Sequence, residues 1–202
     1  MMMTHKRSIL FWFDFASTYS YPAAMRIATL ADSSNIQVIW RPFLLGAIFQ
    51  QQGWNDSPFN IYPAKGAYMW RDMARLCMRE NLDFKRPTVF PRNGLMASRI
   101  VCANHNELWI PAFVRHVFQA NFKYDLNIAD LDVITKILND LDLDADKILN
   151  QIKQQEIKNL LRQQTDEAIQ SGVFGAPSFI VEGELFWGND QLEHALDWCI
   201  DH

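Results

Sequence analysis

The segment Ile9–Ser20, with the sequence ILFWFDFASTYS, decides how the rest of this chain folds. Residues 9–15 are apolar and aromatic except for Asp14, which is typical of a buried β-strand, and a helical pattern follows through about Ala31. The tetrapeptide STYS at 17–20 therefore stands at a predicted turn and helix start. Unpaired backbone N–H groups and the helix dipole make such an N-terminus favourable for an anion.

Serines occupy the first and fourth positions of this tetrapeptide. Cysteines there would form Cys-x-x-Cys, a motif of thiol redox catalysis. A serine cannot form a disulfide, but its hydroxyl can hold the thiolate of another molecule. The alternative for Ser17 is purely structural, because serine is a preferred N-cap residue that satisfies a free helix N–H. The segment by itself leaves both interpretations open.

Strand patterns gather at the two ends of the chain, and helical patterns fill the middle. Residues 36–40 are mostly β-branched and aromatic, which predicts a second strand. Helices are predicted over about 63–81, 94–104, 108–121, 130–139, 145–152 and 155–170. After a break at 172–177, residues 178–181 and 185–187 predict a β-hairpin, and a helix from about Asp190 closes the chain.

This order of elements predicts an α/β protein in which both ends of the chain contribute to one sheet. The plan resembles a thioredoxin-like fold with an inserted all-helical domain. Residues 8–45 and 172–202 are expected to form the discontinuous thioredoxin-like domain, and residues 46–171 the inserted helical domain.

Composition excludes several classes of protein. The 202 residues are 49% hydrophobic and 21% charged, which is typical of a globular chain, and the net charge of −4 disfavours binding to nucleic acid or to an acidic membrane. Cys77, Cys102 and Cys199 are odd in number and far apart, which favours buried thiols in a reducing compartment. Asp14 interrupts the apolar run that follows His5, too early for a signal peptide, so we expect a soluble cytoplasmic protein.

Five motifs together resemble one known family. They are FDFASTYSY at 13–21, RP at 41–42, PAKGAYM at 63–69, GVFGAPSF at 172–179 and FWGNDQL at 186–192. The resemblance is to the DsbA-like family of 2-hydroxychromene-2-carboxylate isomerases and kappa-class glutathione transferases, and it runs from about residue 8 to 200. The family usually has proline where this chain has Thr18.

The resemblance implies a glutathione-dependent isomerase of aromatic-compound breakdown, with Ser17 as its catalytic residue. Such an enzyme interconverts 2-hydroxychromene-2-carboxylate and trans-o-hydroxybenzylidenepyruvate through reversible addition of the glutathione thiolate, which the matching serine stabilises. A free thiol with a pKa near 8.5 is only about 3% ionised at pH 7, so such stabilisation matters. The alternatives are a kappa-like glutathione S-transferase, which leaves glutathione on the electrophile, and a non-catalytic binding protein of the same fold.

The same resemblance implies further residues that bind the glutathione cofactor. The residue matching Ala176 makes backbone hydrogen bonds to the peptide, beside an Ala176-Pro177 bond that we expect to be cis. Trp187, Gly188, Asn189 and Asp190 match the segment that receives the γ-glutamyl end, and Asn55 matches a residue that reaches the glycine end. The alternative for Asp190 is a simple helix start, with Glu193 three residues later.

Substrate contacts are expected from Lys65, for an anionic group, and from Asn93, which matches a substrate-binding position of the isomerases. Residues 65–99 hold eight Lys or Arg against three acidic residues, which suits an aromatic carboxylate or another electrophile, although a solvated helix face is the alternative. No spacing of histidines predicts a metal site. The resemblance also implies a homodimer.

Overall fold

Four strands from the two ends of the chain form one sheet in the computed structural model, which describes residues 7–202. They are β1 (Ser8–Phe13), β2 (Gln37–Pro42), β3 (Ser178–Val181) and β4 (Glu184–Trp187), in the order β2-β1-β3-β4. β1 runs parallel to β2 and antiparallel to β3, and β3 runs antiparallel to β4. The predicted single sheet is thereby confirmed. His5, at the start of the segment considered as a signal peptide, lies outside the described residues.

The central strand β1 separates two groups of buried side chains, because successive residues of a strand point to opposite faces. Ile9, Phe11 and Phe13 join the main hydrophobic cluster on one face. Trp12 joins a smaller cluster on the other face, together with Phe43. Burial on both faces explains why this strand is a nearly continuous apolar run. The strand ends at Phe13, and the loop that follows it begins with Asp14.

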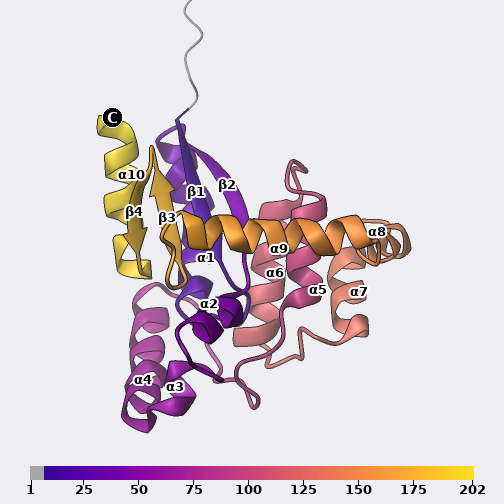
Figure 1. The fold of residues 1–202 in the computed structure, drawn as a ribbon, viewed down its shortest axis with the longest axis horizontal. Coiled ribbons are helices and arrows are strands. Elements are labelled where there is room, and N and C mark those ends of the chain that lie inside the picture. The colour runs from indigo at the N-terminus through magenta and orange to yellow at the C-terminus, as the bar shows by residue number, and fades with distance from the viewer. Residues whose placement is uncertain (1–6) are drawn as a thin grey trace, which may run out of the picture.

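Helices cover the sheet and extend beyond it on one side (Figure 1). They are α1 (Ser20–Ser33), α2 (Leu45–Gln51), α3 (Pro58–Ile61), α4 (Pro63–Arg79), α5 (Leu95–Ala103), α6 (Ile110–Phe122), α7 (Leu131–Asp140), α8 (Ala145–Gln151), α9 (Gln155–Gln170), the 3-10 turn η1 (Asn189–Gln191) and α10 (Leu192–Asp201). α1 packs on α6 and α10, while α5 and α9 pack against β2. The predicted helices are all present, and α2 and α3 are two short helices that the sequence patterns do not predict.

Residues between β2 and β3 contain helices and loops, and no strand occurs in this part of residues 7–202. One hydrophobic cluster nevertheless continues from the sheet into the helices, since Tyr21 of α1 stacks on Phe122 of α6 with ring centroids 5.6 Å apart. The division into a domain of residues 8–45 and 172–202 and an inserted domain of residues 46–171 stays a prediction. Within residues 7–202, no helix is both long enough and apolar enough to cross a membrane.

Candidate functional site

One buried carboxylate fixes the loop that joins β1 to α1. Asp14 Oδ1 accepts a hydrogen bond from the Ala16 N–H at 2.7 Å, and Oδ2 accepts one from the Leu45 N–H at 2.8 Å. The Asp14 carbonyl accepts a third from the Ser17 N–H at 2.9 Å. Burial raises the pKa of Asp14, while the two backbone donors act in the opposite direction. This side chain therefore ties the end of β1 to the start of α2.

The Ser17 hydroxyl joins two segments that are 159 residues apart in the chain. Oγ donates a hydrogen bond to the Ala176 carbonyl at 2.9 Å and accepts one from the Ser20 N–H at 3.3 Å. The N-cap position of α1 is Tyr19, so Ser17 is not the N-cap residue that the structural alternative predicts, although its second bond does hold the first N–H of the helix. The first bond goes beyond such a role. One almost buried hydroxyl thus bridges the N-terminus of α1 and the loop that precedes β3.

The Ala176-Pro177 loop faces Ser17. Its peptide bond is cis, as expected from the sequence. The Gly188 N–H donates to the Pro177 carbonyl at 2.9 Å, so the loop is held from two sides. Within residues 7–202 the Ala176 N–H has no hydrogen-bond partner. This donor is free for the acceptor of an extended ligand.

Two exposed aromatic rings border this loop. Phe174 and Trp187 lie with ring centroids 4.8 Å apart, and about half of each side chain is exposed. Gly175 lies directly against the indole, since a Cβ built on this glycine would stand 2.3 Å from Trp187 Nε1. Only a residue without a side chain fits there. The glycine therefore lets Trp187 approach the backbone just before Ala176.

A cleft of about 400 Å³ opens beside the N-terminus of α1. It is lined by Tyr19, Asp72, Arg75, Leu76, Arg79, Asn189 and Asp190. The Tyr19 hydroxyl donates to Asp72 Oδ2 at 3.0 Å, and Arg75 pairs with Asp72 at 3.0 Å. Burial, and then the Asp72 carboxylate, raise the pKa of Tyr19, so this phenol stays protonated. The cleft thus combines acidic and basic side chains.

Arg26 connects three helices and the η1 turn at the edge of this cleft. It pairs with Glu80 at the end of α4 at 3.4 Å and with Glu193 of α10 at 2.5 Å. Its Nη2 also donates to Asn189 Oδ1 at 3.3 Å. Asn189 is buried, whereas Asp190 beside it is exposed. These contacts of Arg26 hold Asn189 in place and leave the neighbouring Asp190 carboxylate exposed.

The structure brings together some of the predicted site residues. Ser17 donates a hydrogen bond to the Ala176 carbonyl, and Gly188 donates one to the carbonyl of the neighbouring Pro177. Trp187 lies against the same loop at Gly175. Asn189 and Asp190 line the adjoining cleft. Their roles in binding glutathione stay predictions.

Three other predicted residues lie elsewhere. Asn55 is exposed in the loop between α2 and α3, and its side chain makes no hydrogen bond within residues 7–202. The Lys65 ammonium lies over the ring of Tyr62 at 4.7 Å. Asn93 Oδ1 accepts from the Leu95 N–H at 2.8 Å at the start of α5 and lines a different cavity. Their predicted contacts with glutathione or substrate stay predictions.

One side of the cleft was not predicted from the sequence. Asp72, Arg75, Leu76 and Arg79 of α4 face η1 across it. A signal for this arrangement exists in their spacing of i, i+3, i+4 and i+7, which places all four on one helix face. The sequence does not indicate which element that face meets, because the partner is more than 100 residues away.

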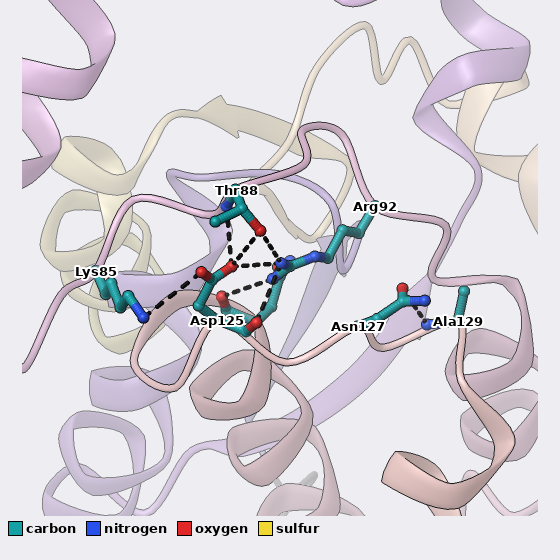
Figure 2. A network of polar contacts seen from close by, with 7 residues as sticks. Lys85, Thr88, Arg92, Asp125, Asn127 and Ala129 are labelled. Atoms are coloured by element: carbon teal, nitrogen blue, oxygen red, sulfur yellow. Dashed lines mark hydrogen bonds and ion pairs between the residues drawn. The ribbon is translucent and has the colours of Figure 1, made fainter.

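A second polar network lies at the end of α6 (Figure 2). Asp125 accepts a hydrogen bond from the Thr88 N–H at 2.9 Å, forms an ion pair with Arg92, and lies 3.6 Å from Lys85 Nζ. The Thr88 N–H first, and then Arg92, lower the pKa of Asp125 to about 2. Arg92 is one of the eight cations of residues 65–99 that were expected to suit an anionic substrate. It is instead buried, and the Asp125 carboxylate neutralises its charge.

This network reaches the candidate site through one buried amide. Arg92 Nη1 donates to Asn121 Oδ1 at 3.1 Å, and Asn121 Nδ2 donates to the Phe15 carbonyl at 3.1 Å. Phe15 lies in the loop held by Asp14, two residues before Ser17. Side chains from the helical part of the chain therefore support the loop that carries Ser17.

The described residues contain no arrangement typical of a metal centre. Within residues 7–202, no group of three His, Cys, Asp or Glu side chains is placed to hold a metal ion. Cys77, Cys102 and Cys199 are buried and form no disulfide. Burial raises the pKa of the Cys77 and Cys102 thiols to about 12, so neither is reactive near neutral pH.

The fold and this Ser17 loop define a thioredoxin-like protein without redox cysteines. The DSBA-like thioredoxin domain matches residues 8–197, and the chain belongs to this family. A 2-hydroxychromene-2-carboxylate isomerase of Sphingobium xenophagum is 25% identical over 197 residues, covering 96% of this chain and 99% of the relative. A kappa 2 glutathione S-transferase of Caenorhabditis elegans is also 25% identical, covering 98% of this chain and 94% of its own.

A solved structure gives the same result for the fold. A 2-hydroxychromene-2-carboxylate isomerase superposes with a TM-score of 0.86 at 21% identity, covering 95% of this chain and 93% of its own. The predicted α/β class and thioredoxin-like fold are confirmed. The relatives also confirm the predicted resemblance to isomerases and kappa-class glutathione transferases.

Proposed function

We propose that this protein is a glutathione-dependent 2-hydroxychromene-2-carboxylate isomerase, which interconverts 2-hydroxychromene-2-carboxylate and trans-o-hydroxybenzylidenepyruvate. The observation that carries the proposal is the Ser17 hydroxyl, which stands where a redox protein has cysteine and donates into the Ala176-Pro177 loop. The isomerase and transferase relatives, which match nearly the whole chain, support it.

The residues around Ser17 fit a γ-glutamyl peptide. Ala176 offers an N–H that has no partner within residues 7–202 and a carbonyl, with which an extended peptide can pair like an added strand. In the cleft, the Asp190 carboxylate suits an ammonium group. Arg75 and Arg79 pair with Asp72 and Glu80 but are more than half exposed, so their remaining N–H groups suit a carboxylate. This combination of charges matches the zwitterionic end of such a peptide.

Bound glutathione supplies a nucleophilic sulfur that adds reversibly to the unsaturated substrate. The role of Ser17 is to donate a hydrogen bond that favours the ionised form of that thiol, and the N-terminus of α1 adds a favourable dipole. Lowering a thiol pKa by two units requires roughly 2.7 kcal/mol of such preferential stabilisation. Asp14 and Asn121 hold the loop, so its backbone needs little reorganisation when a ligand binds, and only the hydroxyl proton has to turn from the Ala176 carbonyl to the sulfur.

The test is turnover of 2-hydroxychromene-2-carboxylate with the free thiol counted throughout. We expect isomerisation that requires glutathione and leaves its concentration unchanged. Loss of thiol in proportion to product would instead identify a kappa-like transferase, the second candidate, which the 98% coverage by a kappa-class relative favours. Calorimetry that detects no binding of glutathione would contradict both and leave a non-catalytic binding protein.

We also propose that the protein works in the cytoplasm. Three buried thiols that form no disulfide support a reducing compartment. Detection of the protein in the soluble fraction of its own cells, apart from secreted and membrane fractions, would check this proposal.

A further inference from the structure

A second cavity of about 380 Å³ lies among α5, α7, α8 and α9. It shares no lining residue with the cleft beside Tyr19. Most of its wall is apolar and comes from Leu95, Met96, Leu131, Leu149 and Ile152. The volume falls in the range of sites that bind small molecules, which are mostly apolar with a few placed polar groups.

Three cations also line this cavity, and no carboxylate does. Within residues 7–202, none of Arg99, Lys153 and Lys158 forms an ion pair with an acidic side chain. Arg99 Nε is fully buried and has no hydrogen-bond partner. The Arg99 charge is therefore partly buried without a carboxylate to balance it, and an anion in the cavity would compensate it.

All the free polar groups of the cavity are donors. Arg99, Lys153 and Lys158 carry only N–H groups, although Lys153 is exposed and already donates to Asn150 Oδ1 at 2.9 Å. Asn93 Oδ1 is used by the Leu95 N–H, which leaves its NH₂. Three like charges around an apolar cavity repel one another, and an anion relieves that repulsion. A carboxylate, which only accepts hydrogen bonds, complements this set.

The wall at Ala129 is anchored by the network in Figure 2. Asn127 Oδ1 accepts from the Ala129 N–H at 3.2 Å, and Arg92 holds Asp125 at the start of the same loop. Arg92 is also the residue next to Asn93 in the chain. The segments that contribute Ala129 and Asn93 to the cavity are therefore held by hydrogen bonds and an ion pair of their own.

We propose that this cavity is a second binding site, which takes a small molecule with an apolar ring and one carboxylate. The ring lies against the aliphatic wall, and the carboxylate meets Arg99 with Lys158 or Lys153. The proposal does not rest on the proposed function, because no residue of the Ser17 loop lines the cavity. Asn93, for which the resemblance implies a substrate contact, is the one predicted site residue in its lining.

The first experiment titrates the full chain with 1-naphthoate in a calorimeter, in the absence of glutathione. The comparison ligand is 1-naphthamide, which has the same ring without the charge. We expect 1-naphthoate to bind at least tenfold more tightly, with an affinity that falls as salt concentration rises. Equal affinities of the two ligands would overturn the proposal.

The second experiment removes one cation at a time. Arg99→Gln and Lys158→Gln should each weaken 1-naphthoate binding about tenfold or more and leave 1-naphthamide unaffected, because each loses a charged hydrogen bond. Lys147→Gln is the matched control, since Lys147 is an exposed, unpaired cation of α8, within residues 7–202, that does not line the cavity. Circular dichroism checks folding; should Arg99→Gln fail to fold, the half-exposed Lys158 decides the result.

A third variant separates the two sites. Ser17→Ala should leave the affinity for 1-naphthoate unchanged, whereas Ala129→Trp should abolish it by filling the cavity. Loss of 1-naphthoate binding in Ser17→Ala would assign the ligand to the Ser17 site and overturn the proposal. Unchanged binding in both Arg99→Gln and Lys158→Gln would overturn it as well.

Discussion

Ser17 carries both of its interactions on a single oxygen atom. It accepts from the N-terminus of α1 and donates to a carbonyl at the other end of the chain. A cysteine here would have a larger, weakly hydrogen-bonding sulfur, which could not hold these two partners equally well. The serine thus supplies hydrogen bonds at a position where a cysteine would supply a thiol.

Replacing Ser17 with Ala should leave the fold intact and slow turnover of 2-hydroxychromene-2-carboxylate about 10- to 100-fold at pH 7, the effect of one charged hydrogen bond. The loss should shrink as pH rises above the ordinary thiol pKa of about 8.5, where glutathione ionises unaided. The measurement is a pH profile of kcat/KM for both proteins.

Ser20→Ala is the matched control for this experiment. Ser20 is fully buried three residues later, and its hydroxyl makes no hydrogen bond within residues 7–202. Its backbone N–H, which donates to Ser17, is unchanged by the substitution. The Ser20 variant should keep the wild-type pH profile. If Ser17→Ala did the same, Ser17 would only support the start of α1.

Asp125 should make the protein sensitive to acid. Its pKa of about 2 in the folded chain lies below the ordinary value of 3.8. Stability from this carboxylate is therefore complete above about pH 4 and is lost as the pH falls towards about 2. Asp125→Asn should flatten that part of the profile when urea midpoints are measured from pH 5 to 2. An unchanged slope would contradict the assignment.

At the scale of elements, α6 supports the loop between β1 and α1 through Asn121. Its amide satisfies the Phe15 carbonyl and the Arg92 guanidinium at once, in a fully buried position. This contact links the helical part of the chain to the loop that carries Ser17. We therefore expect Asn121 to position that loop.

Asn121→Ala should destabilise the fold by about 1–3 kcal/mol, because a carbonyl and a charged group lose their buried partner. Urea unfolding measures the change, and Asn139→Ala, at an exposed asparagine of α7, is the control. We also expect a lower kcat at permissive temperature, since the Ser17 loop loses a support. A loss of stability below 0.5 kcal/mol would contradict this role.

The long elements of this fold could be predicted from local patterns, and the short ones could not. β1, the hairpin of β3 and β4, and helices such as α4 have clear periodicity. α2 and α3 have only seven and four residues, too few for a helical period to be visible.

The hairpin turn is tight because Glu182 and Gly183 both have positive φ, a conformation that Gly183 adopts without strain.

The candidate site required more than local patterns. The contact between Ser17 and Ala176 spans the whole insertion and was not predicted; the family resemblance implied only that both residues belong to one site. The excess of Lys and Arg in residues 65–99 also could not indicate which of these cations line a cavity and which are neutralised inside the protein. Arg92 is buried in an ion pair, Arg75 lines the cleft, and Arg99 lines the second cavity. These differences depend on tertiary neighbours that no short window contains.

At the scale of the whole molecule, we expect a homodimer, as the family resemblance implies. Several large apolar side chains are exposed on the helical part of the surface, among them Tyr68 and Met78 of α4. Sedimentation at micromolar concentration should give a species of twice the 23.5 kDa chain. A single species of 23.5 kDa would contradict the prediction.

The bond from Ser17 to Ala176 has a consequence for which thiols the protein can activate. A hydroxyl has one proton, and in the structure that proton is committed to the Ala176 carbonyl. An amide N–H of a bound peptide would compete for this carbonyl and make it easier for the hydroxyl to turn its proton towards the ligand's sulfur. A simple thiol such as 2-mercaptoethanol has no amide with which to do so. We therefore expect Ser17 to favour the thiolate of a peptide that pairs with Ala176 over that of a simple thiol.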